Sequence, residues 1–128
     1  MQPKHLLGTW MSQEASAGHS AATATETNPI FVAPFDCEIL AIYIAPITAV
    51  TGANTNTTHL NIHAPGAVEI ANLDLTSGNN LTADTINEIA ITTATSLDKG
   101  DLLEIQFEKV GNGLDIPKSI ICVEYQAN

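Results

Sequence analysis

The longest apolar run of the chain, IFVAPFDCEILAIYIA at residues 30–45, constrains the fold most. Its second half, residues 36–45, is rich in β-branched and aromatic residues and lies between Pro34 and Pro46, which favours a strand over a buried helix. Alternation places two apolar sets on opposite faces of this strand: Cys37, Ile39, Ala41, Tyr43 and Ala45 on one, and Leu40, Ile42 and Ile44 on the other. A strand that is apolar on both faces is typical of a central strand covered on two sides.

Further segments alternate in the same way and are separated by Gly, Asn, Pro and Asp turn residues. The predicted strands are residues 59–64, 68–75, 85–93, 103–107 and 119–126. The clearest pattern places Leu103, Ile105 and Phe107 inward. About seven short strands and no convincing helix predict an all-β protein built as an antiparallel β-sandwich.

The first and last predicted strands, residues 36–45 and 119–126, are both apolar on two faces. We therefore expect them to lie side by side in one sheet, which makes the sandwich jelly-roll-like. An immunoglobulin-like sandwich is the alternative, although the Cys…Trp…Cys arrangement of those domains is missing.

Residues 1–29 are small and polar and show no amphipathic period. They predict an extended N-terminal arm, followed by one sandwich domain at residues 30–128, which is the size of a single domain. Apolar side chains near the start of this arm either pack back on the domain or dock on another protein. In the second case the partner-binding residues are Leu6, Leu7, Trp10 and Met11.

The charge of the chain limits its partners. The net charge is −10, with four lysines as the only Lys and Arg residues. Nucleic acids and anionic membranes both need clustered Lys and Arg, so neither is an expected partner. No window approaches the roughly 18 apolar residues of a membrane span, and no signal-peptide pattern is visible. We expect a soluble protein made in the cytoplasm without export.

No residue pattern predicts catalysis, a cofactor or a metal ion. His59 and His63 are four residues apart in a predicted strand, hence about 13 Å apart, too far to share one zinc ion. Glu104 and Glu108 have the same spacing, which does not suit a glycosidase pair. We expect a non-enzymatic protein, with a calcium site in the turn at residues 98–101 as an alternative use of its acids.

The two cysteines, Cys37 and Cys122, both fall in predicted strands. Buried free thiols are the simplest interpretation. A disulfide joining the first and last predicted strands is the alternative, since neighbouring strands bring Cα atoms to bridging distance.

Two short motifs carry a family resemblance. They are VAPFDCEILAIYIA at residues 32–45 and K-G-D-x-L-x-I at residues 99–105. With these motifs in this order, residues 29–125 resemble small structural proteins of tailed bacteriophages. The resemblance is in particular to capsid decoration (cement) proteins built as jelly-roll trimers.

The resemblance implies a virion protein on the capsid exterior. Such a protein binds the major capsid protein of an assembled head, as a homotrimer, and stabilises the head lattice. A rival hypothesis is a receptor- or glycan-binding module of a phage fibre or surface appendage, which would use the loops at residues 51–58 and 111–117.

Overall fold

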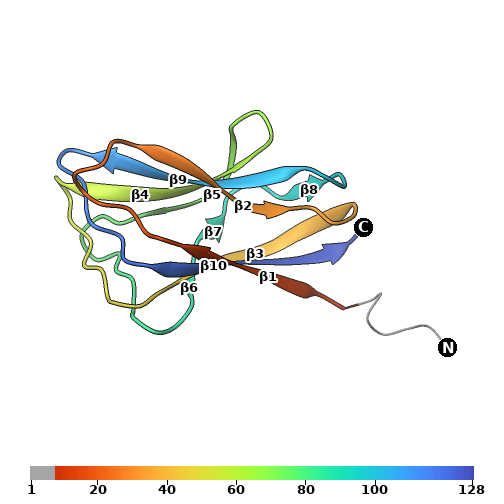
Figure 1. Ribbon diagram of the computed structural model, residues 1–128, viewed down its shortest axis with the longest axis horizontal. Helices are drawn as coiled ribbons and strands as arrows, with labels where there is room; N and C mark the ends of the chain where they lie inside the picture. The colour runs from red at the N-terminus through yellow and green to blue at the C-terminus, as the bar shows by residue number, and fades with distance from the viewer. Residues whose placement is uncertain (1–7) are drawn as a thin grey trace.

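The computed structural model describes residues 8–128 and contains two antiparallel sheets packed face to face, with no helix in this part of the chain (Figure 1). Sheet I has the order β1-β10-β3-β6, and β8 also pairs with β3. Its strands are β1 (Trp10–Ser16), β10 (Ser119–Ala127), β3 (Cys37–Pro46), β6 (Asn87–Glu88) and β8 (Thr95–Leu97). Sheet II has the order β2-β9-β4-β5-β7. Its strands are β2 (Glu26–Val32), β9 (Leu102–Val110), β4 (Thr57–Ala64), β5 (Val68–Asp74) and β7 (Ala90–Ile91).

The chain passes back and forth between the two sheets, as in a jelly roll. Strands β1, β3 and β10 lie in sheet I, whereas β2, β4, β5 and β9 lie in sheet II, and β6 and β8 together occupy the position beside β3. The prediction of an all-β, jelly-roll-like antiparallel sandwich is therefore confirmed. The predicted pairing of the first and last apolar strands is confirmed too, because β3 and β10 are neighbours.

A single hydrophobic core fills the space between the sheets. Leu103, Ile105 and Phe107 of β9 are fully buried in it, as their alternation predicts. Leu60 and Ile62 of β4 are also fully buried beside them. Sheet I contributes Ile42 and Ile44 of β3 and Ile121 and Val123 of β10.

The predicted faces of β3 are wrong because the strand contains a β-bulge. Ile39 lies opposite Tyr125 and Ala41 opposite Glu124, so Leu40 is an extra residue with no partner of its own. One extra residue exchanges the two faces of a strand beyond that point. The inner face of β3 consequently carries Cys37, Ile39, Ile42 and Ile44.

The described part of the predicted arm lies in the sandwich. β1 pairs with β10 along its whole length, and β2 pairs with β9. The sequence does not reveal β1 because three of its four inward positions, Ser12, Glu14 and Ser16, are polar. Pairing of β1 satisfies the backbone groups on the otherwise open edge of β10, which requires no apolar pattern.

The segment 85–93, predicted as one strand, forms two short ones in different sheets. β6 pairs with β3 in sheet I, and β7 pairs with β5 in sheet II. Ile89 lies between them, fully buried, and its N–H donates to the carbonyl of Ile42 at 2.8 Å. The mixed period of this segment reflects a chain that crosses from one sheet to the other.

Cys37 and Cys122 are both free and buried, so the disulfide alternative is wrong. The register explains why: Cys122 lies opposite Tyr43, whereas Cys37 lies opposite Ala127. Six residues of strand therefore separate the two thiols along the sheet, about 20 Å and far beyond bridging distance.

Candidate interaction surfaces

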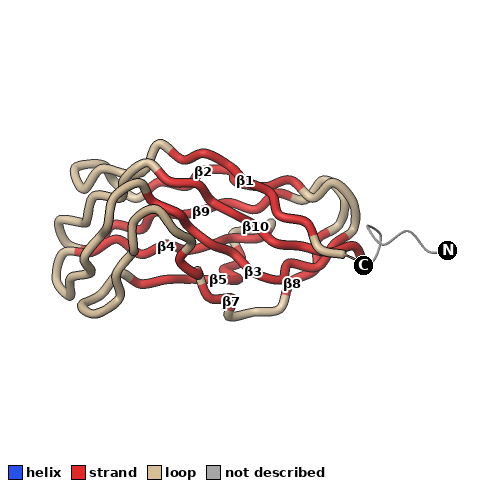
Figure 2. The backbone as a smooth tube through the Cα atoms, turned by 90° about the horizontal axis from the view of Figure 1, so that it is seen from below, coloured by secondary structure: helices blue, strands red, loops and turns tan. Residues whose placement is uncertain are grey.

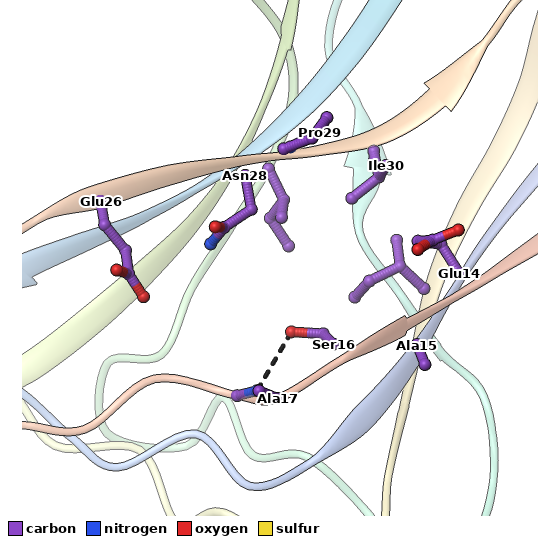
Figure 3. Close-up of a pocket in the computed structure, with 11 residues that line it drawn as sticks. Glu14, Ala15, Ser16, Ala17, Glu26, Asn28, Pro29 and Ile30 are labelled. Carbon is purple, nitrogen blue, oxygen red and sulfur yellow. Dashed lines mark hydrogen bonds between the residues drawn. The ribbon is translucent and has the colours of Figure 1, made fainter.

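A cleft of about 270 Å³ opens between β1 and β2, the edge strands of the two sheets (Figure 3). Its floor contains Ile30, Ile105 and Ile121, and its walls carry the carboxylates of Glu14 and Glu26. Glu26 and Asn28 extend from β2 toward the segment after β1, while Ala15 points away from the gap. The cleft thus combines an apolar floor with an acidic rim.

His19 engages one of the two cleft carboxylates. The Nδ1 atom of this buried imidazole lies 3.0 Å from Oε1 of Glu26, and its ring stacks on Phe107 at 5.3 Å between centroids. Backbone hydrogen bonds in both directions join His19 to Ile116. His19, which the sequence placed in a polar arm, therefore fixes the loop between β1 and β2 to the core.

The one hydroxyl group of the described cleft lining makes a contact with the backbone. Ser16 is the hydroxyl residue of the lining, and its Oγ accepts a hydrogen bond from the backbone N–H of Gly18 at 3.1 Å. Nucleophilic catalysis needs a hydroxyl or thiol hydrogen-bonded to a base, which this arrangement does not provide. The described lining therefore offers carboxylates and one serine hydroxyl that contacts the backbone.

The residues considered for metal or acid–base chemistry lie on the outer face of sheet II, which we call the polar face. Its paired rows include His63 with Glu104 and His59 with Glu108. The Nδ1 atom of His59 lies 3.1 Å from Asp74 and 3.4 Å from Glu108. Within residues 8–128, no group of three or more His, Cys, Asp or Glu side chains has the geometry to hold a metal ion.

Amide side chains connect the polar face. Asn61 is only 4% exposed, and its Nδ2 donates to Gln106 at 2.9 Å and to Glu108 at 3.0 Å. Asn72 donates to Asp74 at 2.6 Å. These amide groups of the polar face thus hydrogen-bond to neighbouring side chains of the same face.

In the turn at residues 98–101, a side-chain carboxylate accepts a hydrogen bond from the backbone. The Oδ2 atom of Asp101 accepts the backbone N–H of Asp98 at 3.0 Å, and the N–H of Asp101 donates to the carbonyl of Asp98. Asp36 accepts the N–H of Lys99 at 2.9 Å. These acids stabilise a tight turn beside the start of β9.

The structure separates the residues predicted to bind a partner. Leu6 and Leu7 lie outside the described residues. The ring of Trp10 packs on Phe35 at 5.3 Å and on Tyr125 at 6.0 Å between centroids, so it belongs to an aromatic cluster of the domain itself. Met11 points to the opposite face of β1 and is 44% exposed.

A hollow of about 500 Å³ adjoins the aromatic cluster at the end of the sandwich where β1 begins and β10 ends. Trp10 and Phe35 supply its apolar lining, and Asp36 and Lys99 supply one charge of each sign. Any segment that precedes β1 joins the domain next to this hollow.

The outer face of sheet I, which we call the apolar face, consists of rows of paired residues that point away from the core. The rows are Ala15, Ile120 and Ala45; Gln13, Cys122, Tyr43 and Glu88; Met11, Glu124 and Ala41; and, at the polar end of the face, Gln126, Glu38 and Ser96. Ile120 is 37% exposed, and continuing the register of β6 places the exposed Ile86 beside Ala45. Within residues 8–128 no second layer covers this face (Figure 2).

Cys122 lies at the centre of the apolar face. It is 3% exposed although it points away from the core, because the side chains around it on the sheet enclose it. Burial raises the pKa of its thiol. Burial, together with the carboxylates of Glu124 and Glu88, also raises the pKa of the neighbouring Tyr43.

The apolar pattern of β3 and β10 is the sequence signal for the apolar face. Apolar residues on both faces of β3 and β10 predicted strands covered on two sides. In the structure one side faces the core, and the other side has no covering layer from residues 8–128. The same pattern thus also marks a sheet face available to a partner.

The two loops named for the rival hypothesis do meet. The backbone N–H of Asn112 donates to Oδ1 of Asn56 at 2.8 Å. Loops gather at this end of the sandwich, away from the end of β10 (Figure 2). Neither loop carries an aromatic side chain on which a sugar ring would stack.

No family model matches this chain, and no curated protein matches it. Among solved structures, the chain is similar to one described as that of infectious bursal disease virus strain Gx, with 14% sequence identity and a TM-score of 0.40. The match covers 94% of this chain and 32% of that chain. A similarity of this size does not establish a shared fold. No helix in residues 8–128 is long and apolar enough to span a membrane.

Proposed function

We propose that this chain is a non-enzymatic structural protein of a virion, which binds the outside of a phage capsid as a homo-oligomer and stabilises the head lattice. The trimer is the oligomer that the family resemblance implies. The protein would be made in the host cytoplasm and would bind the major capsid protein.

One observation carries this proposal: the sandwich presents an apolar face that no layer from residues 8–128 covers. Proteins that work by assembly bury such a face, whereas proteins that remain single usually surround their apolar residues with charge. A jelly roll by itself decides nothing, because the same fold serves capsid proteins, lectins and enzymes.

The N-terminal segment is our proposed contact with the capsid. Leu6 and Leu7 precede β1, which Trp10 fixes to the domain by its contacts with Phe35 and Tyr125. A short apolar segment attached to a rigid base loses less entropy on binding than a free arm would. Several copies in one oligomer would then add their individual contacts.

Co-sedimentation with heads of the encoding phage that lack this protein tests the proposal. We expect the full chain to bind the heads and to raise the temperature at which they rupture. Removal of residues 1–7 should weaken binding without unfolding the domain. Removal of residues 1–29 is not a usable test, because it deletes β1 and part of β2. A full chain that forms oligomers but does not bind heads would overturn the proposal.

The rival function, glycan or receptor binding, has one observation in its favour, the meeting of the loops through Asn56 and Asn112. It predicts glycan binding that survives removal of residues 1–7 and is lost on Asn56→Ala, which removes the side-chain acceptor that joins the two loops. A glycan array with these two proteins separates the rival from the capsid proposal.

A further inference from the structure

We propose that the apolar face is the surface through which copies of this chain associate with one another. The inference rests on the oligomer in the proposed function, and it does not depend on binding to a capsid. It assigns the face to a second copy of this chain and leaves the N-terminal segment for the capsid.

The chemistry of the face departs from that of a solvated sheet surface. Across its first row, Ala15, Ile120 and Ala45 lie side by side without a polar group between them. Antiparallel sheets that meet water usually carry polar residues on the outer side, as sheet II does with His59, Asn61 and their partners. The first row of sheet I instead carries no charged residue, as is typical of the centre of an interface.

The net charge of the chain indicates which partner binds the apolar face. With a net charge of −10, two copies repel each other wherever their acids approach. The outer face of sheet I carries three charged residues, Glu124, Glu88 and Glu38. Glu88 lies at the border of its row, and Glu38 lies at the polar end of the face, where it accepts a hydrogen bond from Gln126. Copies that meet here therefore bring few acids together.

A partner of different charge would prefer another surface. A basic protein would be drawn to the polar face, where Asp74, Glu104 and Glu108 lie. The apolar face offers such a partner little attraction and would cost it desolvation of its own charges. A second copy supplies a surface of matching polarity.

The size of the face is that of a small interface. Strands β1, β10, β3 and β6 have 7, 9, 10 and 2 residues. At about 3.3 Å along the strand and about 4.8 Å between strands, these residues present roughly 440 Å² in projection, about half of the ~800 Å² that each partner of a standard complex buries. A hollow of about 200 Å³ lined by Leu40, Ala41 and Glu88 borders the face and could receive a side chain such as Met11 of the next copy.

The test is Ile120→Glu in the full chain, studied by sedimentation velocity and light scattering. Ile120 lies in the first row, and its partial exposure lets the monomer tolerate the change. The matched control is Val68→Glu, which adds the same charge to an exposed valine of sheet II. Circular dichroism and thermal unfolding verify that both variants fold.

We expect the wild-type protein and Val68→Glu to sediment at a multiple of the 13.5 kDa chain mass. Ile120→Glu should sediment as the monomer, with association weakened about tenfold or more, because a carboxylate would be buried in the interface. Should Ile120→Glu fail to fold, Met11→Glu on the edge strand β1 replaces it with the same expected result.

A wild-type monomer, or an Ile120→Glu oligomer as stable as the wild type, would overturn the inference. A wild-type monomer whose binding to heads or to phosphatidylcholine vesicles is lost on Ile120→Glu would assign the face to that other occupant and overturn it as well. A wild-type oligomer that dissociates on Ile120→Glu but never binds heads would support the inference and overturn the proposed function. A dimer instead of a trimer would support the inference and correct the proposed stoichiometry.

Discussion

The two outer faces of the sandwich belong to sheets of similar size, yet they meet water in different ways. On the polar face, Asn61 donates to Gln106 and Glu108, and His59 contacts Asp74. On the apolar face, Ile120 lies between two alanines, and Cys122 is enclosed by its neighbours. The comparison teaches that one sheet satisfies its outer side with hydrogen bonds and ion contacts, whereas the other leaves apolar side chains at its surface.

The inner sides of the two sheets do not differ in this way. Both contribute aliphatic residues to one core, for example Ile44 from sheet I and Ile105 from sheet II. Burial in the core therefore explains why the inner faces of both sheets are apolar. It does not explain the apolar residues on the outer side of β3 and β10.

The largest expected effect contrasts the core with the apolar face. Phe107→Ala should lower the free energy of unfolding by about 3–5 kcal/mol, because it leaves a cavity in the core between the two sheets. Ile120→Ala should lower it by less than about 1 kcal/mol in the monomer, because its side chain is already partly in water. Urea denaturation at low protein concentration measures both. Equal losses would mean that the apolar face is covered within one chain.

The next effect compares two buried residues that point outward, one on each face. Asn61→Leu should lower the free energy of unfolding by about 1–3 kcal/mol, because Gln106 and Glu108 lose their donor. Cys122→Ala, at a similarly buried site, removes no hydrogen-bond network and should cost about 1 kcal/mol. A larger loss for Cys122→Ala would contradict the contrast between a hydrogen-bonded face and an apolar one.

A third prediction concerns thiol reactivity. Burial raises the pKa of both cysteines above the ordinary 9.0, so at pH 8 each holds less thiolate than an exposed cysteine would. Tyr43→Ala uncovers Cys122, its neighbour on the apolar face, and should accelerate alkylation of Cys122 by iodoacetamide about tenfold. Cys37, which faces the core, should not change.

Mass spectrometry of peptides sampled over time distinguishes the two thiols. Equal acceleration at Cys37 and Cys122 would mean that Tyr43→Ala loosens the whole sandwich. No acceleration at all would mean that Tyr43 does not cover Cys122.

The smallest expected effect lies on the polar face. Asp74→Asn removes a carboxylate that contacts His59 at 3.1 Å, and both groups are partly exposed. Solvent screens such pairs, so the free energy of unfolding should fall by less than about 1 kcal/mol. A loss above about 2 kcal/mol would show that the polar face stabilises the fold through its ion contacts. Thermal unfolding in low and high salt measures the screened part directly.

The sequence by itself determined the fold class and the core of sheet II. Alternation is a local property, and in β9 it directs Leu103, Ile105 and Phe107 inward without help from the rest of the chain. The acidic charge and the absence of arginine likewise follow from composition alone. The pairing of β3 with β10 was predictable because both strands share an unusual apolar pattern.

Only the tertiary structure decided the features that depend on a neighbouring strand. The bulge at Leu40 is visible only in the register with β10, and β1 is a strand because the edge of β10 needs a partner. His19 is buried because Ile116, distant in sequence, pairs with its backbone. Whether an apolar strand face meets the core or a partner depends on what lies above it, and no local pattern of residues contains that information.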